Sequence, residues 1–155
     1  MTLRPAVPAD IPAMADLARA AYARYVPRLG GAEPPAMRPD FDTAIETGCA
    51  WVVDADEGLA AYLLCAETEA AWVIDNLAVA PTHQGYGLGR RLLDMAEDEG
   101  RRRGFTEVRL LTNLVMTENQ AIYAARGYRE TARETILGGS QTRLHYAKPL
   151  SAAAG

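Results

Sequence analysis

The pattern of hydrophobic and polar positions divides the chain into helical and extended segments. Apolar residues recur every three or four positions over residues 10–25 and 86–103, with charged residues between them. This is the pattern of amphipathic helices. Residues 70–80 are a mostly apolar, partly β-branched run that stops before Pro81, as expected of a buried strand. Shorter helices are predicted at residues 40–47 and 119–126.

Six further segments have the character of strands. They are residues 2–7, 49–54, 59–66, 106–112, 128–136 and 142–148, and Gly138-Gly139-Ser140 predicts a hairpin between the last two. The predicted order is β-α-α-β-β-β-α-β-α-β-β. Three consecutive strands in the middle argue against a simple parallel sheet, so we predict an α/β fold with a mixed sheet and helices on its faces. We expect one domain over residues 1–150 and a frayed tail at 151–155.

A glycine-rich segment joins the strand at 70–80 to the long helix. It reads Gln84-Gly85-Tyr86-Gly87-Leu88-Gly89. Exposed backbone N–H groups and the positive end of the helix dipole would make this turn a site for phosphate. The spacing matches neither the nucleotide-triphosphate loop nor the dinucleotide fingerprint, and a ligand-free structural turn is the alternative.

Two motifs give the chain a family resemblance. Gln84-x-x-Gly87-x-Gly89 resembles the [R/Q]-x-x-G-x-[G/A] acyl-CoA loop of the GNAT superfamily of N-acyltransferases. Residues 119–128 resemble the second signature of that family through Asn119, Ala121, Tyr123, Gly127 and Tyr128, with slightly different spacing. The element order is also that of the GNAT fold, so the resemblance covers residues 2–149.

The resemblance implies a role for several residues in binding acetyl-CoA and transferring its acetyl group. Backbone groups of one strand segment would pair with the pantetheine arm, and a side chain on the later helix would hydrogen-bond it. Tyr123 would protonate the sulfur of the leaving thiolate. The implied acetyl-CoA-binding residues are Leu77, Ala78, Val79, Gln84, Gly85, Gly87, Leu88, Gly89, Arg90, Asn119 and Tyr123.

The general base and the acceptor site are less strongly encoded. Asp75 is a carboxylate in an otherwise apolar strand, on one face with Leu77 and Val79 by strand alternation. It is a candidate base, and the alternative is a structural carboxylate that pairs with a nearby arginine or caps a loop. Glu33 in the long loop is a second, weaker candidate. Residues 26–39 form a proline-rich loop too long to be only a connector. The resemblance to the GNAT fold implies an acceptor cleft lined by Tyr22, Tyr25, Glu33, Met37, Tyr128 and the turn at 138–142.

Composition limits the partners. The net charge of −4 disfavours nucleic acid, and no apolar run reaches the 18 residues of a membrane span. Cys49 and Cys65 suggest buried thiols in a reducing cytoplasm, and His83 and His145 are too isolated to suggest a metal site. By analogy with the family, a homodimer is possible.

The predicted activity is acetyl-CoA-dependent N-acetylation of a primary amine on a small molecule or peptide. Direct attack in a ternary complex is favoured over an acyl-enzyme, because neither cysteine lies near a histidine in a recognisable arrangement. Two alternatives remain: a non-catalytic acyl-CoA-binding regulatory module, and an interaction protein whose glycine loop binds nothing.

Overall fold

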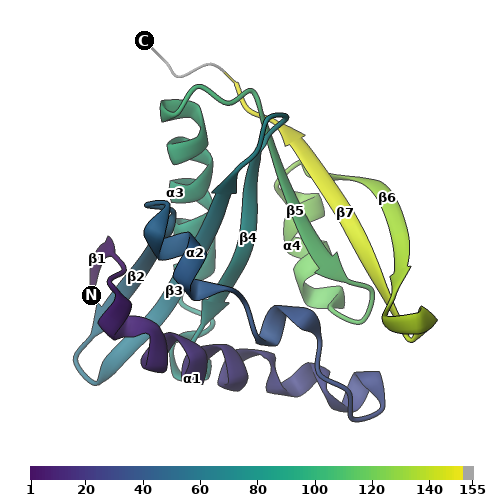
Figure 1. Ribbon diagram of the computed structural model, residues 1–155, viewed down its shortest axis with the longest axis horizontal. Coiled ribbons are helices and arrows are strands. Elements are labelled where there is room, and N and C mark those ends of the chain that lie inside the picture. The colour runs from purple at the N-terminus through teal and green to yellow at the C-terminus, as the bar shows by residue number, and fades with distance from the viewer. Residues whose placement is uncertain (152–155) are drawn as a thin grey trace.

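The computed structural model, which describes residues 1–151, contains one seven-stranded sheet in the order β1-β2-β3-β4-β5-β7-β6 (Figure 1). Only β4 and β5 run parallel, and the other neighbours are antiparallel. The predicted mixed sheet and element order are therefore confirmed, while residues 152–155 of the predicted tail lie outside the described residues. The strands are β1 Thr2–Pro5, β2 Ala50–Ala55, β3 Gly58–Glu67, β4 Trp72–Val79, β5 Glu107–Asn113, β6 Arg129–Ile136 and β7 Gln141–Pro149.

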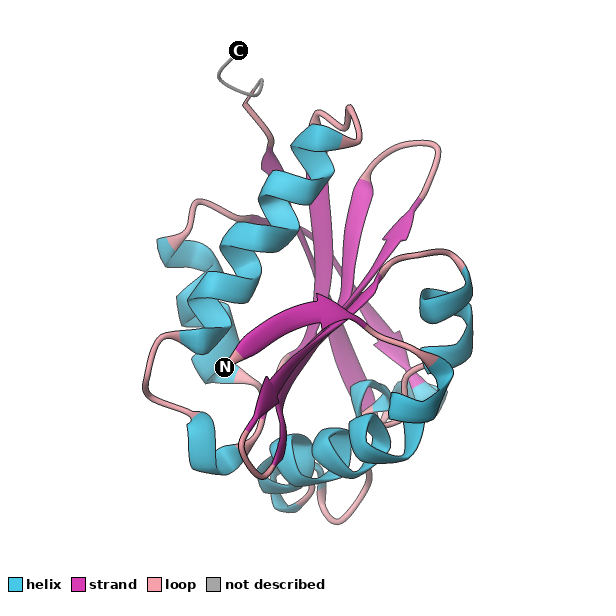
Figure 2. Cartoon of the chain, turned by 90° about the vertical axis from the view of Figure 1, so that its left-hand side faces the viewer, coloured by secondary structure: helices cyan, strands magenta, loops and turns pink. Residues whose placement is uncertain are grey.

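Four α-helices cover the two faces of this sheet (Figure 2). Helices α1 (Ile11–Tyr22) and α2 (Phe41–Glu46) pack on one face, where Met14, Phe41 and Tyr62 belong to one buried cluster. Helix α3 (Leu88–Arg102) packs on the opposite face, and α4 (Thr117–Ala125) contributes Tyr123 to the same side. Because helices cover both faces, β3 is buried continuously from Ala60 to Cys65 rather than at alternate positions.

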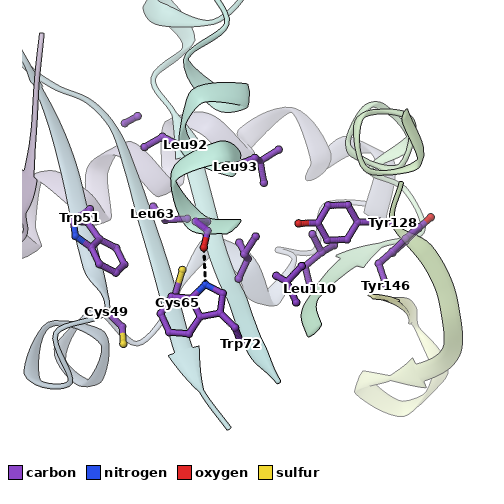
Figure 3. Close-up of a cluster of buried hydrophobic side chains, with 14 of the residues drawn as sticks. Cys49, Trp51, Leu63, Cys65, Trp72, Leu92, Leu93, Leu110, Tyr128 and Tyr146 are labelled. Atoms are coloured by element: carbon purple, nitrogen blue, oxygen red, sulfur yellow. Dashed lines mark hydrogen bonds between the residues drawn. The ribbon is translucent and has the colours of Figure 1, made fainter. Parts of the chain in front are cut away.

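The larger buried cluster lies between the sheet and α3 and fixes the position of that helix (Figure 3). The indole N–H of Trp72 donates to the carbonyl of Ala96, at 2.9 Å between nitrogen and oxygen. A Cβ added to Gly100 would lie only 2.6 Å from Cδ1 of Trp72. Glycine is therefore required inside this helix by close approach to the sheet, a packing demand that helical periodicity does not reveal.

The helix boundaries differ from the predictions where the backbone leaves helical geometry. Helix α3 begins at Leu88 instead of residue 86, because Gly87 has a φ of 81°. Helix α1 ends at Tyr22, and Ala23–Tyr25 continues as a 3₁₀ turn. Asp10, which directly precedes α1 and is of a residue type that often caps helices, makes no capping bond here: its carboxylate accepts from the backbone N–H of Val7 and binds Arg4.

Two smaller differences concern the start of α4 and the loop over residues 26–39. Helix α4 begins at Thr117, two residues before the predicted start. The loop over residues 26–39 contains two 3₁₀ turns, Pro27–Leu29 and Pro35–Met37.

Within residues 1–151, no helix has the length and apolar character required to cross a bilayer.

Candidate active site

The site begins where β4 and β5 separate. Their parallel pairing covers only Trp72–Ile74 and Val108–Leu110, although β4 continues to Val79 and β5 to Asn113. Beyond these pairs, β4 remains paired with β3 and β5 with β7. Figure 1 shows the two strands diverging towards α1. The sheet is therefore split at its centre, and two cavities open along the split.

A β-bulge lies at the start of the split. On β3, Leu64 and Cys65 are adjacent, but their partners on β4 are Asn76 and Ile74, so Asp75 is the extra residue. The alternation that would place Asp75 on one face with Leu77 and Val79 is thus interrupted at Asp75 itself, so that argument does not apply to this residue. Bulges re-aim side chains, and here the bulge accompanies placement of a carboxylate at the cavity.

The first cavity, of about 450 Å³, lies over the glycine loop. Gly85 and Gly87 have φ values of 86° and 81°, which side-chain-bearing residues rarely adopt, and an added Cβ at either would meet no atom within 4 Å. The open space is therefore kept by the glycines. Gln84 anchors the loop by donating from Nε2 to the carbonyl of Val79 at 3.0 Å.

This loop leads directly into the first turn of α3, whose N-terminal N–H groups and dipole suit an anion. A CoA pyrophosphate therefore fits the residues present. All but one of the residues predicted to bind acetyl-CoA line this cavity: Leu77, Ala78, Val79, Gln84, Gly85, Gly87, Leu88, Gly89, Arg90 and Asn119.

The remaining residue, Tyr123, lines the second cavity, which has a volume of about 270 Å³. Asp75 lines the same cavity, so the structure brings the predicted acid and base together. Tyr22, Leu77 and Asn119 line both cavities and mark their junction. The hydroxyl of Tyr22 donates to the carbonyl of Leu77 at 3.0 Å.

The tyrosines that line the second cavity, Tyr22 and Tyr123, hold their protons. Burial, followed by the neighbouring Tyr25, raises the pKa of Tyr123 to about 12. Burial and then Tyr62 raise the pKa of Tyr22 well above its ordinary value. Tyr123 packs against Tyr128 and Tyr146, with ring centroids 5.8 and 6.1 Å away, and its hydroxyl has no hydrogen-bond partner among residues 1–151.

The surroundings of Asp75 favour a carboxylate that accepts a proton. Its side chain reaches solvent at the cavity, yet partial burial and then the charge of Asp40 raise its pKa above the ordinary value of an aspartate. A general base works best when its pKa approaches the operating pH, so both influences favour this role. Asp75 has no hydrogen bond or ion pair within the described part of the chain.

Several predicted acceptor residues lie elsewhere. Tyr25 lines the cavity over the glycine loop. The Glu33 carboxylate binds the guanidinium of Arg38 at 2.7 Å and lines neither cavity. Met37 and Tyr128 are core residues, and the hydroxyl of Tyr128 donates to the Glu97 carboxylate at 2.8 Å. Within the segment 138–142, no residue lines either cavity.

Other residues of the second cavity were not predicted from the sequence. Asn76 donates to the carbonyl of Ala36 and accepts from the hydroxyl of Tyr62, which attaches the long loop to β4. Asp40 and Arg143 supply charge. On β7, the polar residues Arg143 and His145 alternate with the buried Leu144. This alternation in the sequence could have predicted that Arg143 lies on a polar face of the strand.

Comparisons with known proteins agree with this arrangement. Residues 12–128 match the acetyltransferase (GNAT) family. An IAA acetyltransferase of Azospirillum brasilense is 31% identical over 77 residues, which span 50% of each chain.

Solved structures share the fold. The ribosomal-protein-S18-alanine N-acetyltransferase from Escherichia coli superposes with a TM-score of 0.74 at 21% identity, covering 99% of this chain and 96% of that one. An aminoglycoside 6'-N-acetyltransferase complexed with coenzyme A gives 0.73 at 14% identity over 100% of both chains. The split sheet, the glycine loop and the family match lead to one conclusion: the chain belongs to the GNAT acetyltransferase family.

Proposed function

We propose that the protein transfers the acetyl group of acetyl-CoA to a primary amine of a small molecule or peptide, by direct attack in a ternary complex. The observation that carries this proposal is the junction of the two cavities. A donor held over the glycine loop can reach the cavity that contains Asp75 and Tyr123 through the shared residues Tyr22, Leu77 and Asn119.

Asp75 accepts a proton from the incoming ammonium group, which frees the nitrogen lone pair. An alkylamine has a pKa of about 10.4, so without a base very little of it is nucleophilic near neutral pH. The nitrogen then bonds to the thioester carbonyl carbon, and the carbon–sulfur bond breaks. The second nitrogen proton is released to solvent, while Tyr123 donates its proton to the leaving sulfur and is reprotonated from solvent.

The backbone of β4 supplies a donor for the negative charge that develops on the carbonyl oxygen. The carbonyl of Leu77 receives the hydroxyl of Tyr22, so it points away from the β3 ladder. The N–H of a strand residue points to the same edge as its carbonyl, and the N–H of Leu77 therefore faces the split. A backbone N–H at this position stabilises an oxyanion.

We also place the protein in the cytoplasm. The support is the pair Cys49 and Cys65, both of which are free and buried, as is usual for thiols in a reducing compartment.

Thiol release from acetyl-CoA, measured with a panel of primary amines, tests the activity. Initial rates at several concentrations of both substrates should give intersecting lines in double-reciprocal plots, as a ternary complex requires. Parallel lines would refute direct attack. If acetyl-CoA binds and no amine releases thiol, the alternative of a non-catalytic acyl-CoA-binding module replaces the enzyme.

A further inference from the structure

The second cavity carries charges of both signs. Three ionised side chains line it among the described residues: Asp40 and Asp75 are acidic, and Arg143 is basic. A cavity for a simple amine needs only the acidic side chains. The arginine is a feature that the proposed chemistry does not use.

The two carboxylates are not equivalent. Asp40 caps α2: its oxygens accept from the backbone N–H of Thr43 at 3.1 Å and from the Thr43 hydroxyl at 2.7 Å. These bonds, the hydroxyl first, hold the pKa of Asp40 below its usual range. Asp75 has no such partner within residues 1–151, so it is the carboxylate left to receive the amine.

Arg143 lies on the other side of β5. It pairs with Asn113 in the β5–β7 ladder and reaches Glu134 on β6 through Nη1 at 3.3 Å. Glu134 is shared, because Nε2 of His145 lies 2.7 Å from the same carboxylate oxygen. The Nε and Nη2 groups of Arg143 have no acceptor in the described part of the chain, and the side chain is 33% exposed. A guanidinium with free donors in a cavity can bind a carboxylate through two hydrogen bonds.

Strand geometry gives the separation of the two residues along and across the sheet. Asp75 follows Ile74, the partner of Leu110, whereas Arg143 is the partner of Asn113. The path from β4 across β5 to β7 is two strand spacings, and the two residues are also offset by two positions along the strands. The Cα atoms of Asp75 and Arg143 are therefore about 12 Å apart in a regular sheet, and the split between β4 and β5 increases this distance. Both side chains line the cavity between these positions, whose volume of about 270 Å³ has room for one short molecule.

We propose that the acceptor is an amino acid, whose amine is received by Asp75 and whose carboxylate is bound by Arg143. This inference rests on the proposed function and adds the substrate class. Arg143 then determines specificity without taking part in proton transfer.

The test compares acceptors that differ only in the carboxylate, with thiol release from acetyl-CoA as the readout. Leucine is compared with leucinamide and isoamylamine, and γ-aminobutyrate with butylamine, which covers α- and ω-amino acids. The wild type should give a lower KM for at least one amino acid than for its partners without the carboxylate. Arg143→Gln should raise that KM by about 10- to 100-fold and leave kcat within about threefold, since it removes a charge-assisted contact with the substrate and no group that transfers a proton.

Two controls separate this role from a structural one. Arg133→Gln removes a guanidinium on neighbouring β6 that pairs with Glu130 and lines neither cavity, and it should change no KM. Arg143→Lys keeps the charge and should recover part of the preference. For the amines without a carboxylate, Arg143→Gln should leave KM unchanged.

The outcomes distinguish this inference from the proposed function. If the amines release thiol but amino acids are not preferred, or if Arg143→Gln affects both classes equally, the amino-acid acceptor is refuted and the acetyltransferase stands. If neither class releases thiol, the proposed activity fails, and the inference fails with it.

Discussion

Removing the hydroxyl of Tyr123 is the sharpest test of the proposed chemistry. In Tyr123→Phe the ring still contacts Tyr128 and Tyr146, and the lost hydroxyl has no protein partner within residues 1–151. The free energy of unfolding should therefore change by less than about 0.5 kcal/mol. The glycine loop is untouched, so the Kd for acetyl-CoA should stay within about threefold of the wild type.

The expected loss in turnover is large, because a general acid contributes about 10²- to 10⁴-fold. This corresponds to about 2.7–5.4 kcal/mol in the activation free energy. The pKa of about 12 adds a pH signature. Tyr123 stays protonated from pH 6 to 10, so the ratio of wild-type to variant kcat should be constant over that range.

The assay is thiol release at saturating acetyl-CoA, with thermal unfolding as a check on the fold. Tyr86→Phe is the matched control, because Tyr86 is 82% exposed within the glycine loop and lines neither cavity. Turnover of Tyr123→Phe within threefold of the wild type would remove Tyr123 from the mechanism. A ratio that falls steeply above pH 9 would show that the tyrosine ionises far below 12.

Three further predictions concern the base, the loop and the core. Asp75→Asn should lower kcat/KM by about 10²- to 10⁴-fold; the wild-type pH–rate profile should fall as pH drops through the raised pKa of Asp75, and a variant that keeps this limb would exclude Asp75 as the base. Gly89→Val should weaken acetyl-CoA binding at least about tenfold by calorimetry, while Gly89→Ala stays near the wild type, because its Cβ would meet Val79 at an ordinary 3.8 Å; equal affinity of the valine variant would refute the loop assignment. Gly100→Ala should destabilise the fold by about 2 kcal/mol in chemical denaturation, since the overlap with Trp72 outweighs about 1 kcal/mol of helix propensity; a more stable variant would show that the indole can move.

Local patterns were sufficient to predict the element order and the glycine loop. Helical periodicity located α3, and the apolar run before Pro81 located β4, because each signal lies within one segment. Gly87 illustrates the limit of such signals. The sequence marked it as a turn glycine, but only its φ of 81° shows that it also shifts the start of α3 to Leu88.

The parts of the site that depend on pairing between distant segments could not be predicted. The bulge at Asp75 is defined by its register against Leu64 and Cys65, and the split by where β5 leaves β4 for β7. Arg143 enters the cavity only because β7 lies beside β5. Tyr128 shows the converse: the family motif drew attention to it, but the Glu97 carboxylate holds it in the core.

Calorimetric titration of the purified protein with acetyl-CoA, with ATP as the control nucleotide, tests the central claim most directly. The glycine loop and the adjoining split lie in one continuous cavity with Leu77 and Asn119, which suits a pyrophosphate followed by a pantetheine arm. We predict a one-to-one complex with acetyl-CoA at micromolar Kd and at least about tenfold weaker binding of ATP, which lacks that arm. Absent binding of acetyl-CoA, or equal affinity for ATP, would contradict the account.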